Sequence, residues 1–223
     1  MNLARTFRAL RKISFNTLKI NFKYLPFRQA IQLPIWISRR CKLMETKGRL
    51  VLSSDIKTGM IRIGYGQIGV VDNRHARCVW ELRGTLEFKG TATLGPGCKI
   101  NVGDKARLVL GDQLSITANT AIACHHSIQI GANCLFSWDS QVMDTDFHGI
   151  YDDSGKRLNP DAPIVIEDGV WIGSRSSILK GSHIPKGCVL AANSVTNKKF
   201  DKDHCLIGGV PAKVLKEDIH WKA

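Results

Sequence analysis

Aliphatic residues recur at every sixth position in the C-terminal half of the chain. Ile166 opens a run of five such positions, which continues through Ile172, Ile178, Ile184 and Leu190. Apolar residues recur every three or four positions in an amphipathic helix and every two positions in a half-buried strand, so this period indicates neither element. It predicts a coil of short flat strands and tight turns, in which one aliphatic residue from each side points inward.

The same period continues upstream, with occasional steps of eight residues. Ten further inward positions are predicted, namely Leu82, Phe88, Leu94, Val102, Leu110, Ile116, Ile122, Ile130, Phe136 and Val142. The longer steps coincide with segments such as 94–97 and 130–133, where Gly and Asn accept the backbone conformations that turns need. Three sides complete a turn of about eighteen residues, and several turns must stack because one cannot bury its apolar face alone.

The repeat is interrupted between Val142 and Ile164. The interrupting segment, residues 144–163, begins Asp-Thr-Asp-Phe-His and contains two glycines and two prolines. Functional side chains concentrate in loops that a rigid scaffold positions, so we expect this loop to be functional. Its histidine, His148, is a candidate general base, because neutral imidazole accepts a proton near physiological pH. The alternative is an ordinary surface histidine.

These patterns divide the chain into three parts. Residues 1–49 form a basic segment that we expect to be helical or irregular, residues 50–216 form the coil, and residues 217–223 form a short tail. The basic segment holds twelve of the 32 Lys and Arg residues and a single acid, Glu45. The net charge of +13 is therefore +11 in this segment and +2 in the remainder.

The start of the basic segment has an amphipathic pattern. Five residues can share one helical face, namely Leu3, Phe7, Leu10, Ser14 and Leu18. One interpretation is a helix that caps the coil with a solvated basic face. Another is peripheral contact of residues 1–30 with an anionic membrane. A third, nucleic-acid binding, lacks a recognised module, so we expect no nucleic acid as a partner.

The seven cysteines are an odd number and contain no CxxC pair. Cys98, Cys134 and Cys188 occupy the fifth position of their six-residue repeats, which predicts buried thiols in a reducing compartment. No signal peptide or apolar run of transmembrane length is visible. We therefore expect a cytoplasmic location, with the inner face of the membrane as the place of any membrane contact.

Over roughly residues 82–216, the repeats resemble the hexapeptide-repeat acyltransferases. The resemblance implies an all-β fold, a left-handed parallel β-helix, to which the basic N-terminal segment and a short C-terminal extension are attached. The left hand comes from the family, because crossovers between parallel strands are otherwise right-handed. The resemblance also implies a homotrimer with its sites in clefts between subunits.

The segment VMDTDFH, residues 142–148, resembles the catalytic segment of sugar O-acyltransferases in this family. The resemblance implies that His148 deprotonates the acceptor hydroxyl. Asp144 and Asp146 would orient the imidazole or bind acceptor hydroxyls, although Asp also stabilises turns by bonding its own loop backbone. Trp138 would stack on a sugar ring of the acceptor, or it is an outward-facing packing residue.

Three further segments, 170–173 (VWIG), 190–195 (LAANSV) and 209–214 (GVPAKV), resemble the CoA-binding end of the family. A groove for pantetheine is implied at small residues, namely Gly173, Ser174, Ala191 and Ala192. Contacts to the CoA phosphates are implied for Lys198, Lys199 and Lys213, which could equally be solvated surface lysines. A backbone N–H near Gly173 or Ser174 is a candidate donor to the oxyanion.

Three positions depart from the family pattern. Asn193 stands where Gly is usual, but Asn also tolerates left-handed backbone. Lys199 replaces an acid and could strengthen a phosphate contact. Val210 replaces an Asn, so any polar contact of that Asn is lost.

The fold also houses zinc carbonic anhydrases of the γ type, which hold the metal with three histidines. Asp153 stands where a second ligand would follow His148, and His125 and His126 are adjacent, which makes one shared metal difficult. We therefore expect no metal.

The sequence predicts a CoA-dependent O-acyltransferase, with acetyl-CoA as co-substrate. The acceptor is expected to be a sugar hydroxyl of a surface polysaccharide or of its lipid-linked precursor. Two alternatives stay open: a non-catalytic β-helix that serves as a scaffold or binding protein, and an acetyltransferase for an antibiotic or an amino sugar.

Overall fold

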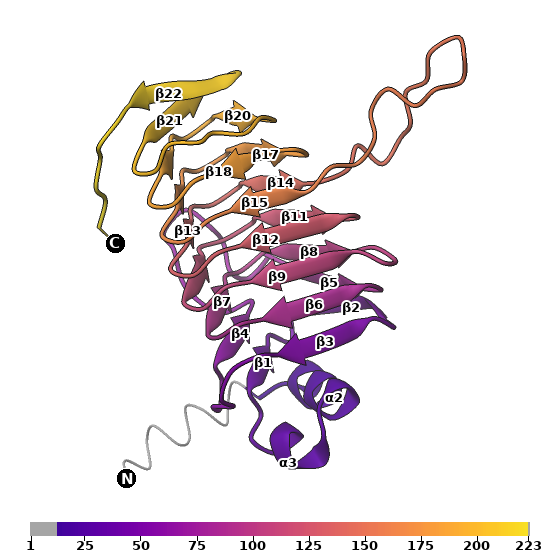
Figure 1. Ribbon diagram of the computed structural model, residues 1–223. Coiled ribbons are helices and arrows are strands. Elements are labelled where there is room, and N and C mark those ends of the chain that lie inside the picture. Colours follow the sequence, from indigo (N-terminus) through magenta and orange to yellow (C-terminus); the bar gives the residue numbers. More distant parts are fainter. Residues whose placement is uncertain (1–12, 223) are drawn as a thin grey trace.

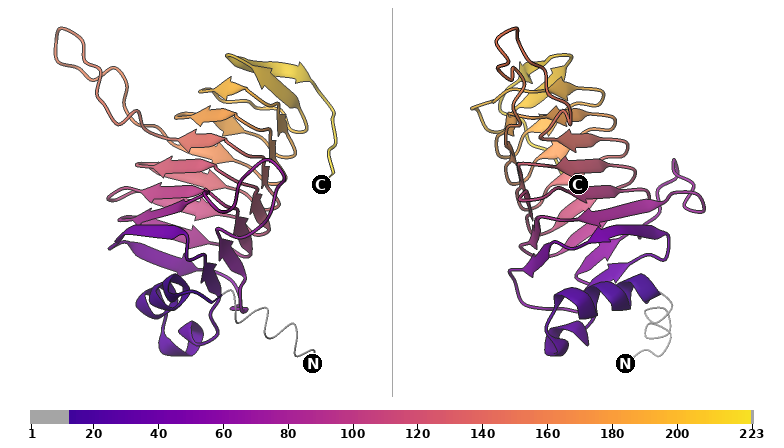
Figure 2. Two further views of the ribbon diagram at one scale, coloured as in Figure 1. Left: turned by 180° about the vertical axis from the view of Figure 1, so that it is seen from behind. Right: turned by 90° about the vertical axis from the view of Figure 1, so that its right-hand side faces the viewer.

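The computed structural model describes residues 13–222. Two short helices, α2 (Phe15–Tyr24) and α3 (Phe27–Ala30), precede a coil of parallel strands that stack into three flat sheets (Figure 1). Each turn of the coil from β1 to β18 contributes one strand to each sheet. The molecule is therefore a three-sided prism with the helices at one end and the C-terminal strands at the other (Figure 2).

The first sheet contains nine strands. In spatial order they are β1 (Ile35–Ile37), β4 (Ile61–Ile63), β7 (Ala92–Leu94), β10 (Leu114–Ile116), β13 (Leu135–Phe136), β16 (Trp171–Ile172), β19 (Val189–Leu190), β21 (Leu206–Gly209) and β22 (Ala212–Lys216). All neighbours pair in parallel except β21 and β22, which pair antiparallel at the C-terminal end.

The second and third sheets follow the same order along the coil. The second contains β2 (Cys41–Thr46), β5 (Cys78–Leu82), β8 (Lys99–Val102), β11 (Ala121–Cys124), β14 (Gln141–Met143), β17 (Ser177–Leu179) and β20 (Val195–Thr196). The third contains β3 (Arg49–Leu52), β6 (Thr85–Phe88), β9 (Arg107–Leu110), β12 (Ser127–Ile130), β15 (Ile164–Ile166) and β18 (His183–Ile184). We call the edge between the first and second sheets the first corner, that between the second and third sheets the second corner, and that between the third and first sheets the third corner.

The core is a column of aliphatic and aromatic side chains along the prism axis. All fifteen inward positions predicted from the six-residue period are at most 2% exposed. The strand register explains this burial, because inward residues of successive turns are direct partners. Val142, for example, pairs with Ile122 of the preceding turn and with Ile178 of the following turn. The prediction of a repeating coil is confirmed.

The coil starts earlier than the sequence predicts. Strands β1 and β2 lie within residues 1–49, which we expected to be helical or irregular, and they pair in parallel with β4 and β5. No six-residue period marks this first turn, because its sides have irregular lengths. The basic segment is therefore partly helix and partly β-helix.

Helix α2 caps the exposed edge of strand β1 with polar side chains. Asn21 donates to the Ile35 carbonyl (2.7 Å) and accepts from its N–H (3.2 Å), while the Thr17 hydroxyl makes the equivalent pair of bonds to Ile37 (3.1 and 2.9 Å). An edge strand with free N–H and C=O groups invites pairing with another chain, and these contacts prevent it. Of the predicted helical face, Ser14 is instead the N-cap residue of α2, Leu18 is exposed, and Leu3, Phe7 and Leu10 lie outside the described residues.

All seven cysteines are buried free thiols, as the sequence predicts for three of them. Burial raises the pKa of Cys134 and of Cys188 to about 11, so both thiols are protonated at neutral pH. Neither helix of the described residues 13–222 has the length and apolar character that crossing a membrane requires.

Candidate active site

The loop of residues 144–163 leaves the coil at the second corner and projects far from it (Figures 1 and 2). It begins after β14 and returns at β15, where other turns of the coil use a few residues. His148 lies in this loop and is exposed. Its backbone N–H donates to the Asp146 carbonyl (2.7 Å), and its carbonyl accepts from the Asn159 amide (2.9 Å). Its imidazole has no hydrogen-bond partner among residues 13–222, so it is available to a substrate.

Asp146 fastens the loop to the next turn of the coil. Its carboxylate accepts from the Lys180 ammonium (2.5 Å) and from the Asn159 amide (2.7 Å), and Lys180 also donates to the Asn159 carbonyl (2.9 Å). The Lys180 contact, followed by the Asn159 contact, lowers the pKa of Asp146 below its ordinary value. Both contacts are made by Oδ2 of Asp146, and neither involves the imidazole of His148.

Asp144 is fully buried and binds the backbone of the preceding turn. Its two carboxylate oxygens accept from the N–H groups of His125 (2.6 Å) and His126 (2.9 Å). Burial and then the Asp144 carboxylate raise the pKa of the Cys124 thiol. The carboxylate therefore points into the corner of the coil, where it stabilises a turn, and does not contact the exposed imidazole of His148.

A second contact supports the start of the loop. The ring of Phe147 packs edge-on against the ring of His125, with 4.9 Å between centroids. His125 in turn shares a hydrogen bond of 2.7 Å with the Asn101 side chain. The sequence does not mark Lys180, Asn159 or His125 as supports of the loop, because none stands in a recognisable motif and their contacts join different turns.

The small residues predicted to hold pantetheine lie at the first corner. They are Gly173, Ser174, Ala191 and Ala192, which follow β16 and β19. A Cβ at Gly173 would lie 2.5 Å from the Ala192 nitrogen, so the stacking of turns alone requires glycine here. The Gly173 N–H donates to the Leu190 carbonyl (2.7 Å) and is not free to bind an oxyanion.

Trp138 lies at the same first corner, one turn before Ser174. The Arg175 N–H donates to the Trp138 carbonyl (3.0 Å), and the Asn193 N–H donates to the Ser174 carbonyl (2.9 Å), so these turns stack in register. Asn193 has a φ of 57°, in the left-handed region that Asn tolerates in place of Gly. Trp138 is half-buried and is separated from His148 of the same chain by the width of the second sheet.

The three lysines predicted to bind CoA phosphates do not come together. Lys198 and Lys199 are exposed at the second corner, where the Lys198 ammonium lies 5.2 Å from the centroid of the Phe200 ring. Lys213 is exposed in β22, at the end of the first sheet. Within one chain, His148 and the predicted pantetheine groove thus lie at opposite edges of the second sheet.

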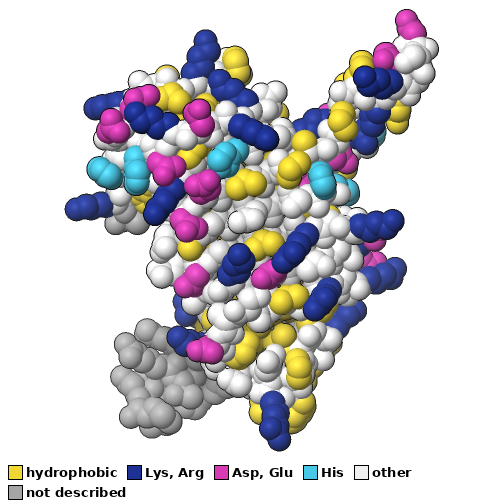
Figure 3. All heavy atoms as spheres, viewed as in Figure 1, with side chains coloured by type: hydrophobic (Ala, Val, Ile, Leu, Met, Phe, Trp, Pro, Cys, Tyr) yellow, Lys and Arg dark blue, Asp and Glu magenta, His cyan; other side chains and the backbone are white. Residues whose placement is uncertain are grey.

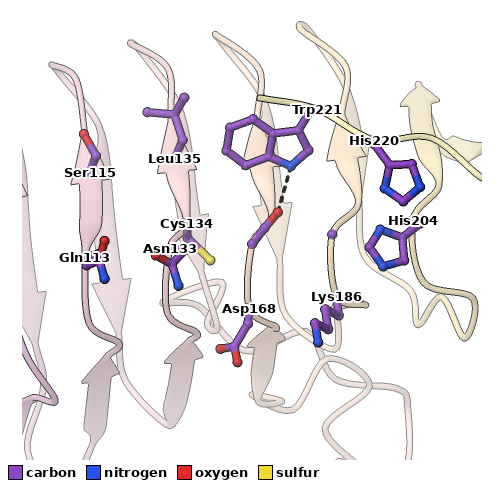
Figure 4. A pocket seen from close by; sticks show the side chains of 12 residues that line it. Gln113, Ser115, Asn133, Cys134, Leu135, Asp168, Lys186, His204, His220 and Trp221 are labelled. Carbon is purple, nitrogen blue, oxygen red and sulfur yellow. Dashed lines mark hydrogen bonds between the residues drawn. The ribbon is translucent and has the colours of Figure 1, made fainter. Parts of the chain in front are cut away.

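Two hollows mark the surface of the C-terminal half. One, of about 440 Å³, lies under the loop and is lined by Asp146, Leu158, Asn159, Pro160, Ala162, Leu179, Lys180 and Asn197. The other, of about 670 Å³, lies beside the third corner and beneath the C-terminal tail (Figure 4). Neither is lined by His148.

The tail folds back along the first sheet to cover the larger hollow. The Trp221 indole donates to the Gly169 carbonyl (2.8 Å; Figure 4). The centroid of the Trp221 ring lies 5.8 Å from that of Trp171. His204 and His220 lie side by side, with 5.0 Å between ring centroids. The sequence shows only an aromatic residue in a short polar tail, which does not predict this contact.

Among residues 13–222, no three His, Cys, Asp or Glu side chains are grouped to hold a metal ion.

Comparisons with known proteins identify relatives along most of the chain. No protein-family profile matches. The chain is 28% identical over 214 residues to an uncharacterized 24.8 kDa protein in the cps region of Klebsiella pneumoniae. The matched segment covers 95% of this chain and 92% of that protein. The chain is 28% identical over 188 residues to a polysialic acid O-acetyltransferase of Neisseria meningitidis, which covers 84% of this chain and 74% of the relative.

The fold is shared with a solved structure. The polySia specific acetyltransferase NeuO superposes with a TM-score of 0.63 at 21% identity, over 82% of this chain and 89% of that one. The predicted all-β fold, a left-handed parallel β-helix, is confirmed by this likeness and by the three parallel sheets. With its six-residue period and its prism of parallel strands, the chain is thus similar in sequence to a polysialic acid O-acetyltransferase and shares the left-handed β-helix fold of the acetyltransferase NeuO.

Proposed function

We propose that this protein is a CoA-dependent O-acetyltransferase that acts on a sugar hydroxyl of a surface polysaccharide or of its lipid-linked precursor. One observation carries most of the proposal. His148, with a free and exposed imidazole, lies in the loop that interrupts the coil of a chain similar to a polysialic acid O-acetyltransferase over 84% of its length. The polysialic acid named as that relative's acceptor supports a polysaccharide as the acceptor here.

The reaction is a direct transfer of acetyl from acetyl-CoA to the acceptor. The imidazole of His148 takes the proton of the sugar hydroxyl while the oxygen attacks the thioester carbonyl. The resulting oxyanion needs hydrogen-bond donors, and the Ser174 N–H is a candidate, since the Gly173 N–H is bonded within the coil. The oxyanion then collapses to the ester, the C–S bond breaks, and the imidazolium gives its proton to the departing CoA thiolate.

The separation of the two halves of the site supports an oligomer. His148 lies at the second corner, and Gly173, Ser174, Ala191, Ala192 and Trp138 lie at the first. Side-by-side packing of two prisms brings the second corner of one copy to the first corner of its neighbour. We propose a homotrimer, in which three such contacts close into a ring.

The charged residues near these corners fit the two substrates. In the proposed assembly, Lys198, Lys199 and Lys213 bind phosphates of CoA as exposed cations. Asp144 and Asp146 act as positioning residues, because their carboxylates are bonded to the chain itself. We further propose a cytoplasmic location, with residues 1–30 in peripheral contact with the inner face of the membrane.

Two measurements on the purified full-length chain test the proposal. Acetyl-CoA should raise the melting temperature, and radiolabelled acetyl should pass from acetyl-CoA to polysialic acid or lipopolysaccharide acceptors. A chain that acetyl-CoA does not stabilise would be a scaffold rather than a transferase. Stabilisation together with transfer only to amino sugars or antibiotics would replace the acceptor and keep the transferase.

A further inference from the structure

Helix α2 has two faces of unusual character. The face that covers the coil carries polar side chains, Thr17 and Asn21, together with Ile20. The opposite face carries Phe15 and Phe22, both exposed. A helix that only caps a protein core shows the reverse arrangement, with apolar residues inward and polar residues outward. The outward face of α2 is therefore suited to contact something other than water.

Helix α3 and the residue after it extend this apolar surface. The five exposed members of what we call the terminal patch are Phe15, Leu18, Phe22, Phe27 and Ile31. Phe15 is 79% exposed and Phe27 is 70% exposed, and the rings of Phe22 and Phe27 lie 6.1 Å apart. Hydrophobic side chains and Lys or Arg side chains stand next to each other at this end of the molecule (Figure 3).

The charge on the two helices has a single sign. Lys19, Lys23 and Arg28 lie on the exposed surface of the two helices, beside the apolar residues. Residues 1–31 contain seven Lys or Arg and no Asp or Glu. Apolar side chains flanked by cations are typical of helices that lie in the interface of an anionic bilayer.

The same charge argues against a second copy of this chain as the occupant. A self-complementary contact would place Lys19, Lys23 and Arg28 against their own equivalents without an acid between them. Residues 1–12 add four further Lys or Arg and no acid to this end of the sequence, which favours an anionic surface as the partner. An anionic lipid surface pairs these cations and buries the apolar side chains.

We propose that the terminal patch docks the protein on an anionic lipid bilayer, with the coil standing on its helical end. The proposal deepens the membrane contact of residues 1–30 proposed above by naming its surface and lipid, and it rests on the proposed acetyl transfer only for a consequence that concerns the acceptor. In the second sheet, four steps separate β2 from β14, where the loop with His148 begins. At about 4.8 Å a step, the loop starts about 19 Å further along the coil. The acceptor hydroxyl would therefore belong to a glycan that extends well beyond its lipid anchor.

The test is sedimentation of the full-length protein with vesicles of phosphatidylcholine alone or mixed with phosphatidylglycerol. We expect binding to the mixed vesicles that weakens at high salt. The double substitution Phe15→Ser with Phe22→Ser should weaken it by on the order of tenfold or more, because two aromatic rings no longer insert. A matched control, Val70→Ser with Leu215→Ser, removes two exposed apolar side chains elsewhere and should leave binding unchanged.

Three results would overturn the proposal: no vesicle binding by the wild type, equal binding by the Phe15 and Phe22 double variant, or a change in that variant's oligomeric state without a change in vesicle binding. Because both positions are exposed, the variant should fold, and its melting temperature checks this. Stabilisation by acetyl-CoA is measured on the same samples. If acetyl-CoA does not stabilise the protein, the proposed acetyl transfer is rejected and the vesicle result is unaffected. If acetyl-CoA stabilises the protein but vesicles do not bind it, only the docking surface is rejected.

Discussion

Replacement of Asp144 by Ala separates a structural role from a catalytic one. The carboxylate is fully buried and accepts two backbone N–H groups, from His125 and His126. A hydrogen bond to a charged group contributes about 1.5–3 kcal/mol, and a buried donor left unpaired adds a further cost. We therefore expect Asp144→Ala to lower the free energy of unfolding by about 3–5 kcal/mol.

The assay is thermal unfolding followed by circular dichroism. In a chain of this size, 1 kcal/mol corresponds to about 2–4 °C, so the melting temperature should fall by about 10 °C. Asp146→Ala is the matched control, because its side chain is 44% exposed and an ion pair in contact with solvent contributes about 1 kcal/mol or less. If Asp144→Ala melted within about 2 °C of the wild type and lost turnover, our structural assignment of Asp144 would be wrong.

Further predictions concern the stacking of turns and the attachment of the loop. Gly173→Ala should destabilise the coil by several kcal/mol, since its Cβ would lie 2.5 Å from the Ala192 nitrogen, whereas Gly69→Ala, with no atom within 4 Å, should melt as the wild type does. Lys180→Met should leave the melting temperature nearly unchanged but make the loop more sensitive to limited proteolysis, and unchanged cleavage would show that the ion pair does not hold the loop. The pKa of Asp146 is lowered in the folded protein, so the attachment of the loop through this carboxylate is complete above the ordinary Asp pKa of 3.8. The attachment is lost as the pH falls through the lowered pKa. Proteolytic cleavage of the loop, measured along a pH series, should therefore rise below pH 3.8.

The six-residue period predicted the coil because the apolar character of each inward position indicates that its side chain is buried. The burial of the inward positions from Leu82 to Leu190 could be predicted without knowing the partner strands, since parallel stacking in register places equivalent positions on top of each other. The first turn, with β1 and β2, was missed because its sides differ in length and its edge is satisfied by Thr17 and Asn21 of a helix rather than by another turn.

The candidate site was harder to predict, because its contacts cross between turns. The sequence marked the loop and His148, but it gave Asp144 and Asp146 the same possible roles. The structure distinguishes them, with Asp144 bonded to the backbone of the preceding turn and Asp146 bonded to Lys180 of a later one. No local pattern encodes such partners, because they depend on which corner each residue occupies.

The central claim is that His148 is the general base of acetyl transfer. The most direct measurement is turnover of His148→Ala with acetyl-CoA and the identified acceptor, beside His126→Ala, which replaces an exposed histidine outside the loop. We predict that His148→Ala keeps its melting temperature and its stabilisation by acetyl-CoA but loses about 10²–10⁴-fold in kcat. The control should keep its rate. A His148→Ala protein with near wild-type turnover would contradict the account.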